Sequence, residues 1–228
     1  MSINQQKEFN GVAIVMDKKE ARVSHFEIAR VLDIQAKSTL QLITDYEADF
    51  NELGVLRFEN AKPLKGTSGG RPERIAYLNE DQSFLLLSYS RNTEKVRCAK
   101  VRMVKAFKAA RDALVLHETQ YLPMHHACHD GVHQIAMQAR AQGSTTPEAM
   151  FHINVEKLIN KVFGFPPHMR HTLTPQQQTQ VSMAYTIYEQ STQHVLSQGL
   201  PANDAYALAK PLIEQLAGMM NIQQLGAA

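Results

Sequence analysis

Apolar residues recur at three- and four-residue steps along the segment from Asn92 to Leu116. The recurring positions are Val96, Ala99, Met103, Ala106, Phe107, Ala110 and Leu114. At about 100° per residue they fall on one side of a helix, so the pattern predicts a long amphipathic helix with a buried apolar face. Asn92 or Thr93 is expected to cap its first turn, because both side chains accept hydrogen bonds from free backbone amides.

Shorter patterns before this helix predict a hairpin followed by a pair of helices. β-branched and alternating residues predict strands at Val12–Met16 and Arg22–Val23. Capping-box spacings that begin at Ser24 and at Ser38 predict two short helices, the second reaching Glu52. Because only a tight turn separates the two helices, we expect a helix-turn-helix.

The next segment has the pattern of a β-hairpin with a long loop. Strands are predicted at Gly54–Phe58 and Arg74–Leu78, on either side of a loop rich in Gly, Lys and Arg. Such a hairpin after a helix pair is the arrangement of a wing. Asn79 is then expected to cap a helix that ends at Tyr89 and buries its run of Phe and Leu residues.

The second half of the chain has the pattern of a helical domain. Pro123 and the loss of basic residues indicate a boundary, and helices are predicted at Thr146–Gly164 and Thr174–Gly199. A last helix, capped by Asn203 or Asp204, has an apolar face made of Ala205, Leu208, Ala209, Leu212, Ile213 and Leu216.

The predicted fold class is therefore α+β. A winged-helix-like domain with small β-hairpins is expected at residues 1–118, and it ends in the long basic helix. A mostly α-helical domain for self-association or partner binding is expected at residues 119–228.

Composition and charge support a globular protein with two chemically different halves. The chain has 228 residues, 44% of them hydrophobic, and a formal net charge of +2. The sequence contains no apolar run long enough for a membrane span or a signal peptide, so we expect a protein of the bacterial host cytoplasm. The two cysteines, Cys98 and Cys128, are expected to be free thiols.

Basic residues in the first half suggest a contact surface. Arg97, Lys100, Lys108 and Arg111 project from one side of the long helix, and the hairpin loop carries Lys62, Lys65 and Arg71. These cations are suited to nucleic acid or to an acidic protein, although a solvated helix face and an ordinary exposed loop explain them equally simply. Between Ser38 and Glu52 the second helix of the pair has acidic residues and no Arg or Lys, which argues against direct reading of DNA.

Histidines are concentrated in the second half, and three of them share one helical spacing. His125, His129 and His133 occur at four-residue steps, so they share a helix face and are suited to a divalent metal. The three span about 12 Å along a straight helix, so one ion reaches two of them and not all three. Packing or hydrogen bonding between helices is the simpler explanation, since the sequence shows no second ligand cluster. We therefore expect no cofactor, and without an oxyanion constellation we expect no enzyme.

The order of several motifs resembles a known family. Gly70-Arg71-Pro72, Tyr77-Leu78-Asn79, the run of residues 84–87 (FLLL) and the Lys-rich long helix occur in the arrangement of the phage regulatory protein family Rha. The resemblance covers about residues 9 to 114 and implies a phage-encoded regulator with a winged-helix-like module. The segments LPMHHACHDGVHQIAMQA and INKVFGF resemble the C-terminal region of some phage antirepressors.

These resemblances imply a phage antirepressor that binds a prophage repressor directly and relieves silencing of lytic genes. The helical half is expected to form a homo-oligomer, a dimer or a tetramer, because several amphipathic helices can build a shared core. One alternative is a DNA-binding regulator that uses Ser24 to Asn51 as helix-turn-helix and Lys62 to Arg74 as wing. A metalloprotein centred on the three histidines is the other.

Overall fold

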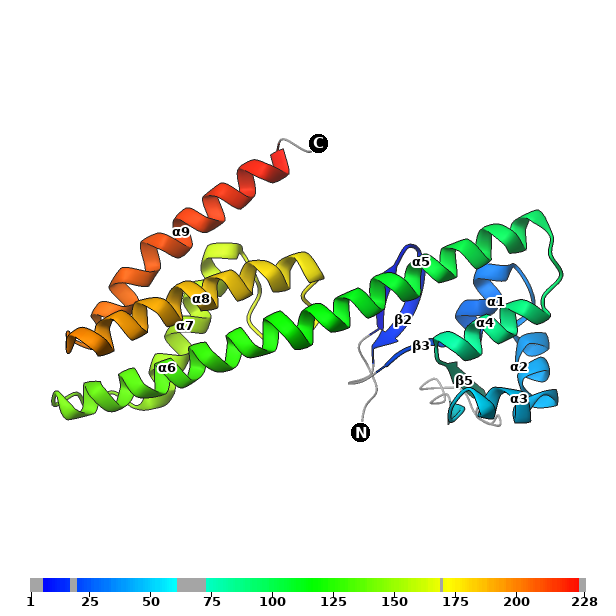
Figure 1. The fold of residues 1–228 in the computed structure, drawn as a ribbon, viewed down its shortest axis with the longest axis horizontal. Coiled ribbons are helices and arrows are strands. Elements are labelled where there is room, and N and C mark those ends of the chain that lie inside the picture. Colours follow the sequence, from blue (N-terminus) through cyan, green and yellow to red (C-terminus); the bar gives the residue numbers. More distant parts are fainter. Residues whose placement is uncertain (1–5, 17–19, 61–72, 169, 226–228) are drawn as a thin grey trace, which may run out of the picture. The chain divides into compact units, whose positions relative to one another are not determined.

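The computed structural model describes residues 6–16, 20–60, 73–168 and 170–225. The chain divides into two compact units, residues 1–114 and 115–228, which are described one at a time (Figure 1). The first unit combines a small antiparallel sheet with helices, and the second is helical. The predicted α+β class is confirmed. Among the described residues, no helix combines the length and apolar composition that crossing a membrane requires.

The first unit contains a five-stranded antiparallel sheet in the order β1-β2-β3-β5-β4. Its strands are β1 (Gln6–Phe9), β2 (Val12–Met16), β3 (Ala21–Ser24), β4 (Arg57–Asn60) and β5 (Arg74–Leu78). The predictions of β2 and β5 are confirmed, whereas β1 was not predicted. Asn10 and Gly11 join β1 to β2 with φ of 50° and 74°, the conformation that an Asn-Gly hairpin turn requires.

Five helices complete the first unit. They are α1 (His25–Leu32), α2 (Ala36–Asp45), α3 (Glu47–Glu52), α4 (Glu80–Tyr89) and α5 (Glu94–Leu116). The predicted caps of α1 and α4 are confirmed: Ser24 Oγ accepts the amide of Glu27, and Asn79 forms a capping box with Gln82.

Two elements have other boundaries than the sequence predicted. The helix predicted from Ser38 to Glu52 is two helices, because Tyr46 leaves helical geometry with φ of −114° and ψ of 30°. The first of them begins at Ala36, two residues before the Ser38 that was expected to cap it. The strand predicted at Gly54–Phe58 begins only at Arg57, since Gly54 has a φ of 124° and does not continue a strand.

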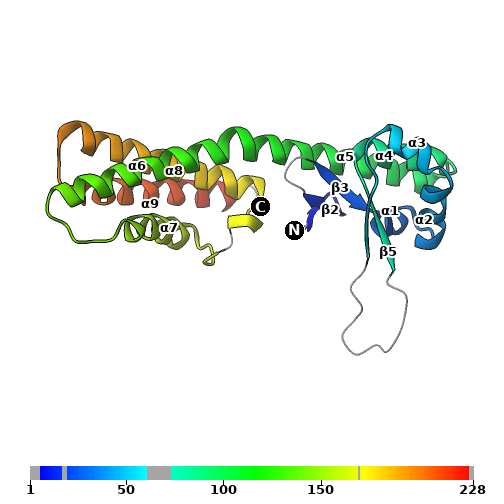
Figure 2. The same ribbon diagram turned by 90° about the horizontal axis from the view of Figure 1, so that it is seen from below.

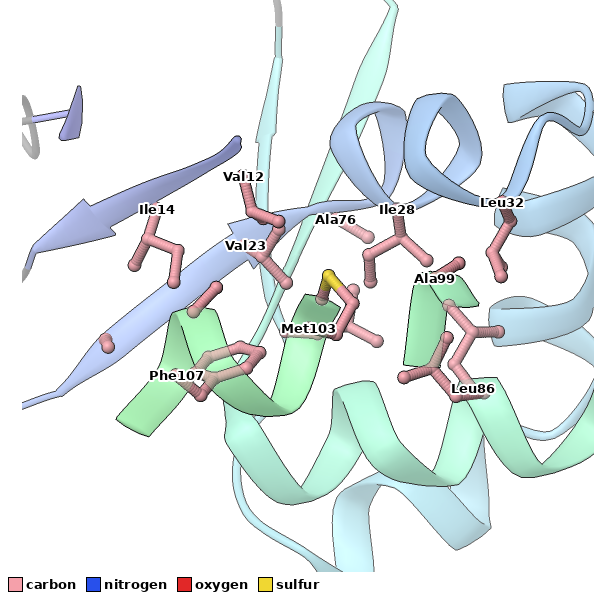
Figure 3. Close-up of a cluster of buried hydrophobic side chains, with 14 of the residues drawn as sticks. Val12, Ile14, Val23, Ile28, Leu32, Ala76, Leu86, Ala99, Met103 and Phe107 are labelled. Carbon is pink, nitrogen blue, oxygen red and sulfur yellow. The ribbon is translucent and has the colours of Figure 1, made fainter. Parts of the chain in front are cut away.

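The core of the first unit lies between the sheet, α1, α4 and α5. Figure 3 shows Met103 of α5 pointing toward Val23 of β3 and Ile28 of α1, with Phe107 one turn further along the same helix. The apolar face predicted for α5 is buried from Val96 to Ala110. Because α5 supplies one side of this core, its opposite side is left for solvent or a partner.

The second unit is built from four long helices. After the π-helix η1 (His117–Tyr121) come α6 (Leu122–Ala141), α7 (Glu148–Phe163), the short 3-10 helix η2 (Arg170–Thr172), α8 (Pro175–Gln198) and α9 (Asp204–Leu225). Helices α6 and α9 each contact both α7 and α8, which gives a four-helix arrangement (Figure 2). Its core holds Val132, Ile159, Tyr185 and Ile213.

The predicted ends of α7 and α8 are confirmed. Gly164 and Gly199 follow them in the left-handed conformation, with φ of 71° and 61°, and Thr174 forms a capping box at the start of α8. The predicted apolar face of α9 is only partly buried. Ala209 and Ile213 lie in the core, but Leu208 and Leu212 are 41% and 49% exposed. Helix α9 therefore carries an uncovered apolar stripe.

Candidate functional site

The helix pair and the β4–β5 hairpin occur in the predicted order in the first unit. Helix α1 ends at Leu32, and the left-handed conformation of the next residue, Asp33 (φ 58°, ψ 46°), turns the chain sharply toward α2. In the hairpin, the guanidinium of Arg74 lies 3.4 Å from the centre of the Phe58 ring. The predicted loop residues Lys62, Lys65 and Arg71 lie outside the described residues.

The exposed surface of α2 and α3 is acidic. Asp45, Asp49 and Glu52 are exposed, and Lys37 near the start of α2 is the basic residue among the exposed charges of the two helices. A DNA-recognition helix can use a glutamine side chain to hydrogen-bond a base. Here the side-chain amide of Gln41 donates instead to Asp45 Oδ1 at 2.6 Å. Because phosphates repel carboxylates, this surface is better suited to a protein than to DNA.

An apolar groove of about 560 Å³ lies beside the helix pair, between α1, α2, α4 and the start of α5. Its apolar lining consists of Leu32, Ile34, Leu42, Leu86, Tyr89 and Val96. Ile34 is 46% and Tyr89 39% exposed. At the rim, Lys95 Nζ lies 3.1 Å from Asp33 Oδ2, and Arg91 adds a second cation. We call this surface the helix-pair groove.

Some of the basic residues predicted on α5 already bind other groups of the protein. Arg111 forms an ion pair with Glu80 at 2.9 Å, and Arg97 donates to the carbonyl of Asn92. Lys100 is half-buried and Lys108 is exposed, and neither forms an ion pair with another described residue. Exposed valines, Val101 at 55% and Val104 at 50%, stand among them. A mixed cationic and apolar face of this kind suits a protein contact as well as a phosphate backbone.

In the second unit, α6 and α7 bring histidines and glutamates together in a ladder. His125, His129 and His133 lie on α6, and Glu148, His152 and Glu156 face them from α7. Nδ1 of His129 lies 2.7 Å from Nδ1 of His152, and His133 Nδ1 lies 2.8 Å from Glu148 Oε1. His125, His129 and Glu156 each place one ligand atom within 4.8 Å of the others. We call all six residues the His–Glu ladder.

Glu156 is the electrostatic centre of the ladder. Its Oε1 accepts the hydroxyl of Tyr185 at 2.7 Å and lies 3.3 Å from His129 Nε2, while Arg170 donates to Oε2 at 2.9 Å. Burial alone would raise the pKa of Glu156, but the bond from His129, the charge of Arg170 and the bond from Tyr185 outweigh it and lower that pKa to about 2. Glu156 is therefore a carboxylate throughout the neutral range.

His125 is a neutral ring in this environment. Burial and then the nearby His129 lower the pKa of His125 to about 4. Its Nδ1 is buried and has no hydrogen-bond partner among the described residues. The neighbouring thiol of Cys128 is also buried, which raises its pKa to about 12, so it remains protonated.

The three histidines of α6 are the half of this ladder that the sequence indicated, with the expectation that one ion reaches two of them. His133 does not join His125 and His129, because it lies one turn further along α6, where Glu148 binds it. The third residue whose ligand atom lies within 4.8 Å of those of His125 and His129 is Glu156, on a different helix. The sequence contained a usable signal: His152 and Glu156 have the same four-residue spacing on a predicted helix as His125 and His129. The pairing of those two helix faces is a tertiary feature.

Comparison with known proteins finds one family model that matches the N-terminal part of the chain. Residues 23–112 match the model of the family described as phage regulatory protein Rha. The match runs from β3 to near the end of α5 and so includes the helix pair, the β4–β5 hairpin and the helix-pair groove. No curated protein and no solved structure matches the chain.

Proposed function

Because residues 23–112 form a Rha-like phage regulatory module, we propose that this protein is a phage regulator that acts as an antirepressor. It binds a prophage repressor and draws it away from the state that holds the operator. No chemical reaction is required. By mass action, a partner that binds only the released state of the repressor shifts the population toward release.

The observation that carries this proposal is the acidic exposed surface of α2 and α3 next to an apolar groove. A helix pair that reads DNA needs cations and free amides on its second helix, and here that helix has Asp45 near its end and Asp49 and Glu52 follow it. A protein surface of apolar pocket and charged rim, in contrast, is the usual composition of a protein interface.

The helix-pair groove is the proposed contact for the repressor. Its half-exposed Ile34 and Tyr89 are suited to an amphipathic helix of the repressor, whose apolar residues would enter the groove. The cations Arg91 and Lys95 at the rim would meet acidic residues beside that apolar stripe.

Self-association is assigned to the second unit. Its helices leave several large apolar side chains exposed, among them Leu208, Leu212 and Met219 of α9. In a monomer these side chains would face water, at a cost of about 25 cal/mol for each Å² of apolar surface. A dimer or tetramer that covers the α9 stripe removes that cost.

The direct test is a titration of this protein into the cognate prophage repressor bound to fluorescent operator DNA, with a titration of operator alone in parallel. We expect a loss of anisotropy only where repressor is present, together with co-elution of the two proteins. Binding to the operator without repressor, and no binding to repressor, would reject the antirepressor function in favour of a DNA-binding regulator.

A pair of matched variants tests the groove. Ile34→Glu places a charge in the helix-pair groove, whereas Val55→Glu places the same charge on a residue that is 76% exposed and does not line it. We expect Ile34→Glu to weaken repressor binding by at least about tenfold, the loss of one well-packed contact, and Val55→Glu to leave it unchanged. Equal effects of the two variants would place the contact elsewhere.

A further inference from the structure

We propose that His125, His129 and Glu156 form a binding site for one divalent transition-metal ion, with Zn²⁺ as the ion they suit best. The three side chains come from two helices, and one ligand atom of each lies within 4.8 Å of the others. This site does not rest on the antirepressor proposal, because none of its residues lines the helix-pair groove.

Helix geometry explains why these three residues converge. His125 and His129 are four residues apart on α6, so their rings lie next to each other on one face, with centroids 4.3 Å apart and planes tilted by 39°. Helix α7 contacts α6 and presents Glu156 to that face. One ion cannot reach three histidines on one straight helix, but here the third ligand comes from the neighbouring helix.

The distances suit a tetrahedral ion with small adjustments. Two ligands that each lie about 2.0–2.1 Å from Zn²⁺ are about 3.4 Å apart in a tetrahedral site. His129 Nε2 and Glu156 Oε1 already lie 3.3 Å apart. The remaining separations are at most 4.8 Å, so a side-chain rotation that closes about 1.4 Å brings all three into range.

The surrounding residues hold the ligands in the forms that metal binding needs. If His129 Nε2 faces the ion, its Nδ1 carries the proton and donates to His152 Nδ1 at 2.7 Å. His152 Nε2 then carries a proton toward Glu148, whose Oε1 is 3.6 Å away. This chain of ring nitrogens fixes the tautomer of His129, as the outer partners of metal-bound histidines do.

Glu156 is fixed by groups on both of its oxygens. Arg170 binds Oε2, which leaves Oε1 directed toward the histidines and hydrogen-bonded to Tyr185. The positive charge of Arg170 opposes a cation, but the carboxylate separates the two. His125 adds a buried Nδ1 with no partner among the described residues. Two imidazoles and one carboxylate favour Zn²⁺, Co²⁺ or Ni²⁺ over Mg²⁺ or Ca²⁺ and leave a fourth position for water.

The test uses the full chain without a histidine tag, treated with chelator and then titrated with Co²⁺ as a spectroscopic substitute for Zn²⁺. We expect one Co²⁺ per chain, with visible absorption bands of a four- or five-coordinate site, and displacement by Zn²⁺. His125→Asn and Glu156→Gln should each weaken binding by at least about 100-fold, because each removes one of three ligands. The matched control is His133→Asn, because His133 lies on the same helix face but is not one of the three proposed ligands.

A measurement on the unmodified protein guards against variants that fail to fold. Zn²⁺ should shift the imidazole nitrogen resonances of His125 and His129 and leave those of His133 and His194 in place. The absence of stoichiometric binding would overturn the proposal. So would full binding by folded His125→Asn and Glu156→Gln proteins, or nitrogen shifts confined to other histidines.

Discussion

Nδ1 of His129 lies 2.7 Å from Nδ1 of His152, and the two rings stack with an interplanar angle of 7°. At that separation one nitrogen must donate and the other accept, so one proton lies between the two Nδ1 atoms. Burial, followed by the nearby His129, lowers the pKa of His152, which favours the neutral ring as acceptor. This contact is one of several polar contacts that join α6 to α7, and it orients the His129 ring.

Removing that contact should loosen the proposed metal site without removing a ligand. We expect His152→Leu to weaken Co²⁺ binding by about 10- to 100-fold, the usual effect of losing the partner of a metal-bound histidine. His133→Leu is the control, because His133 also bonds Glu148 but does not touch His129. Equal Co²⁺ affinity for the two variants would show that His152 does not orient His129.

The first unit should become less stable in mild acid because of His25. This side chain is 1% exposed, and its Nδ1 accepts the amide of Ala76 at 3.1 Å, so the folded state holds it unprotonated. Burial lowers the pKa of His25 from 6.5. The unfolded chain therefore binds the proton first, and stability that is complete above about pH 6.5 is lost as pH falls toward the lowered folded value.

Urea unfolding of the protein between pH 8 and pH 5, followed by circular dichroism, measures this loss. His25→Gln removes the titrating ring while keeping a side chain that accepts a hydrogen bond, and its stability should vary less with pH over that interval. An unchanged pH dependence in His25→Gln would assign the acid sensitivity to other histidines.

Gly131 should be required for the close contact of α6 with α8. A Cβ added at this glycine would lie 3.1 Å from Cγ2 of Thr192, which is fully buried. We expect Gly131→Val to lower the free energy of unfolding by about 1–3 kcal/mol, the usual cost of overpacking a core. Gly218→Val is a control in α9, since nothing lies near its added Cβ. Denaturant midpoints of the two variants compare them directly.

If copies of the chain associate through the apolar stripe of α9, charged residues placed in that stripe should disrupt the assembly. We expect Leu208→Glu combined with Leu212→Glu to convert the proposed dimer or tetramer to monomer, measured by light scattering during size-exclusion chromatography. Both side chains are more than two-fifths exposed, so the substitutions leave the core of the unit intact. Met137→Glu, at a residue 61% exposed on α6, is the control. A parent protein that is already monomeric would contradict the assembly.

The DNA-binding alternative makes its own prediction on α5. If Lys100 and Lys108 contact phosphates, the slope of log affinity against log salt concentration should fall by about 2 in magnitude when both are changed to Gln, at about 0.9 per contact. Lys157→Gln with Lys161→Gln, both exposed on α7, provides the control. Under the antirepressor proposal the protein alone leaves operator unbound at about 150 mM salt, and the α5 variant behaves like the parent.

Residue spacing along the chain was enough to predict the local structure and to indicate a Rha-like N-terminal module. Caps at Ser24, Asn79 and Thr174 and the periodicity of α5 depend on residues a few positions apart, so their spacing was sufficient to predict them. The order of motifs from residue 23 to residue 112 likewise indicated the Rha module that the family match confirms. Tyr46 was missed because its departure from helical geometry leaves no turn residue in the sequence.

Which helix faces meet depends on the packing of the whole fold. The four-residue spacings of His125 with His129 and of His152 with Glu156 are each visible in the sequence, but the pairing of α6 with α7 depends on the packing of the whole four-helix unit. The same packing left Leu208 and Leu212 exposed although periodicity placed them on an apolar face. Periodicity specifies a direction around one helix axis, and the neighbour in that direction is chosen by the balance of contacts across the fold.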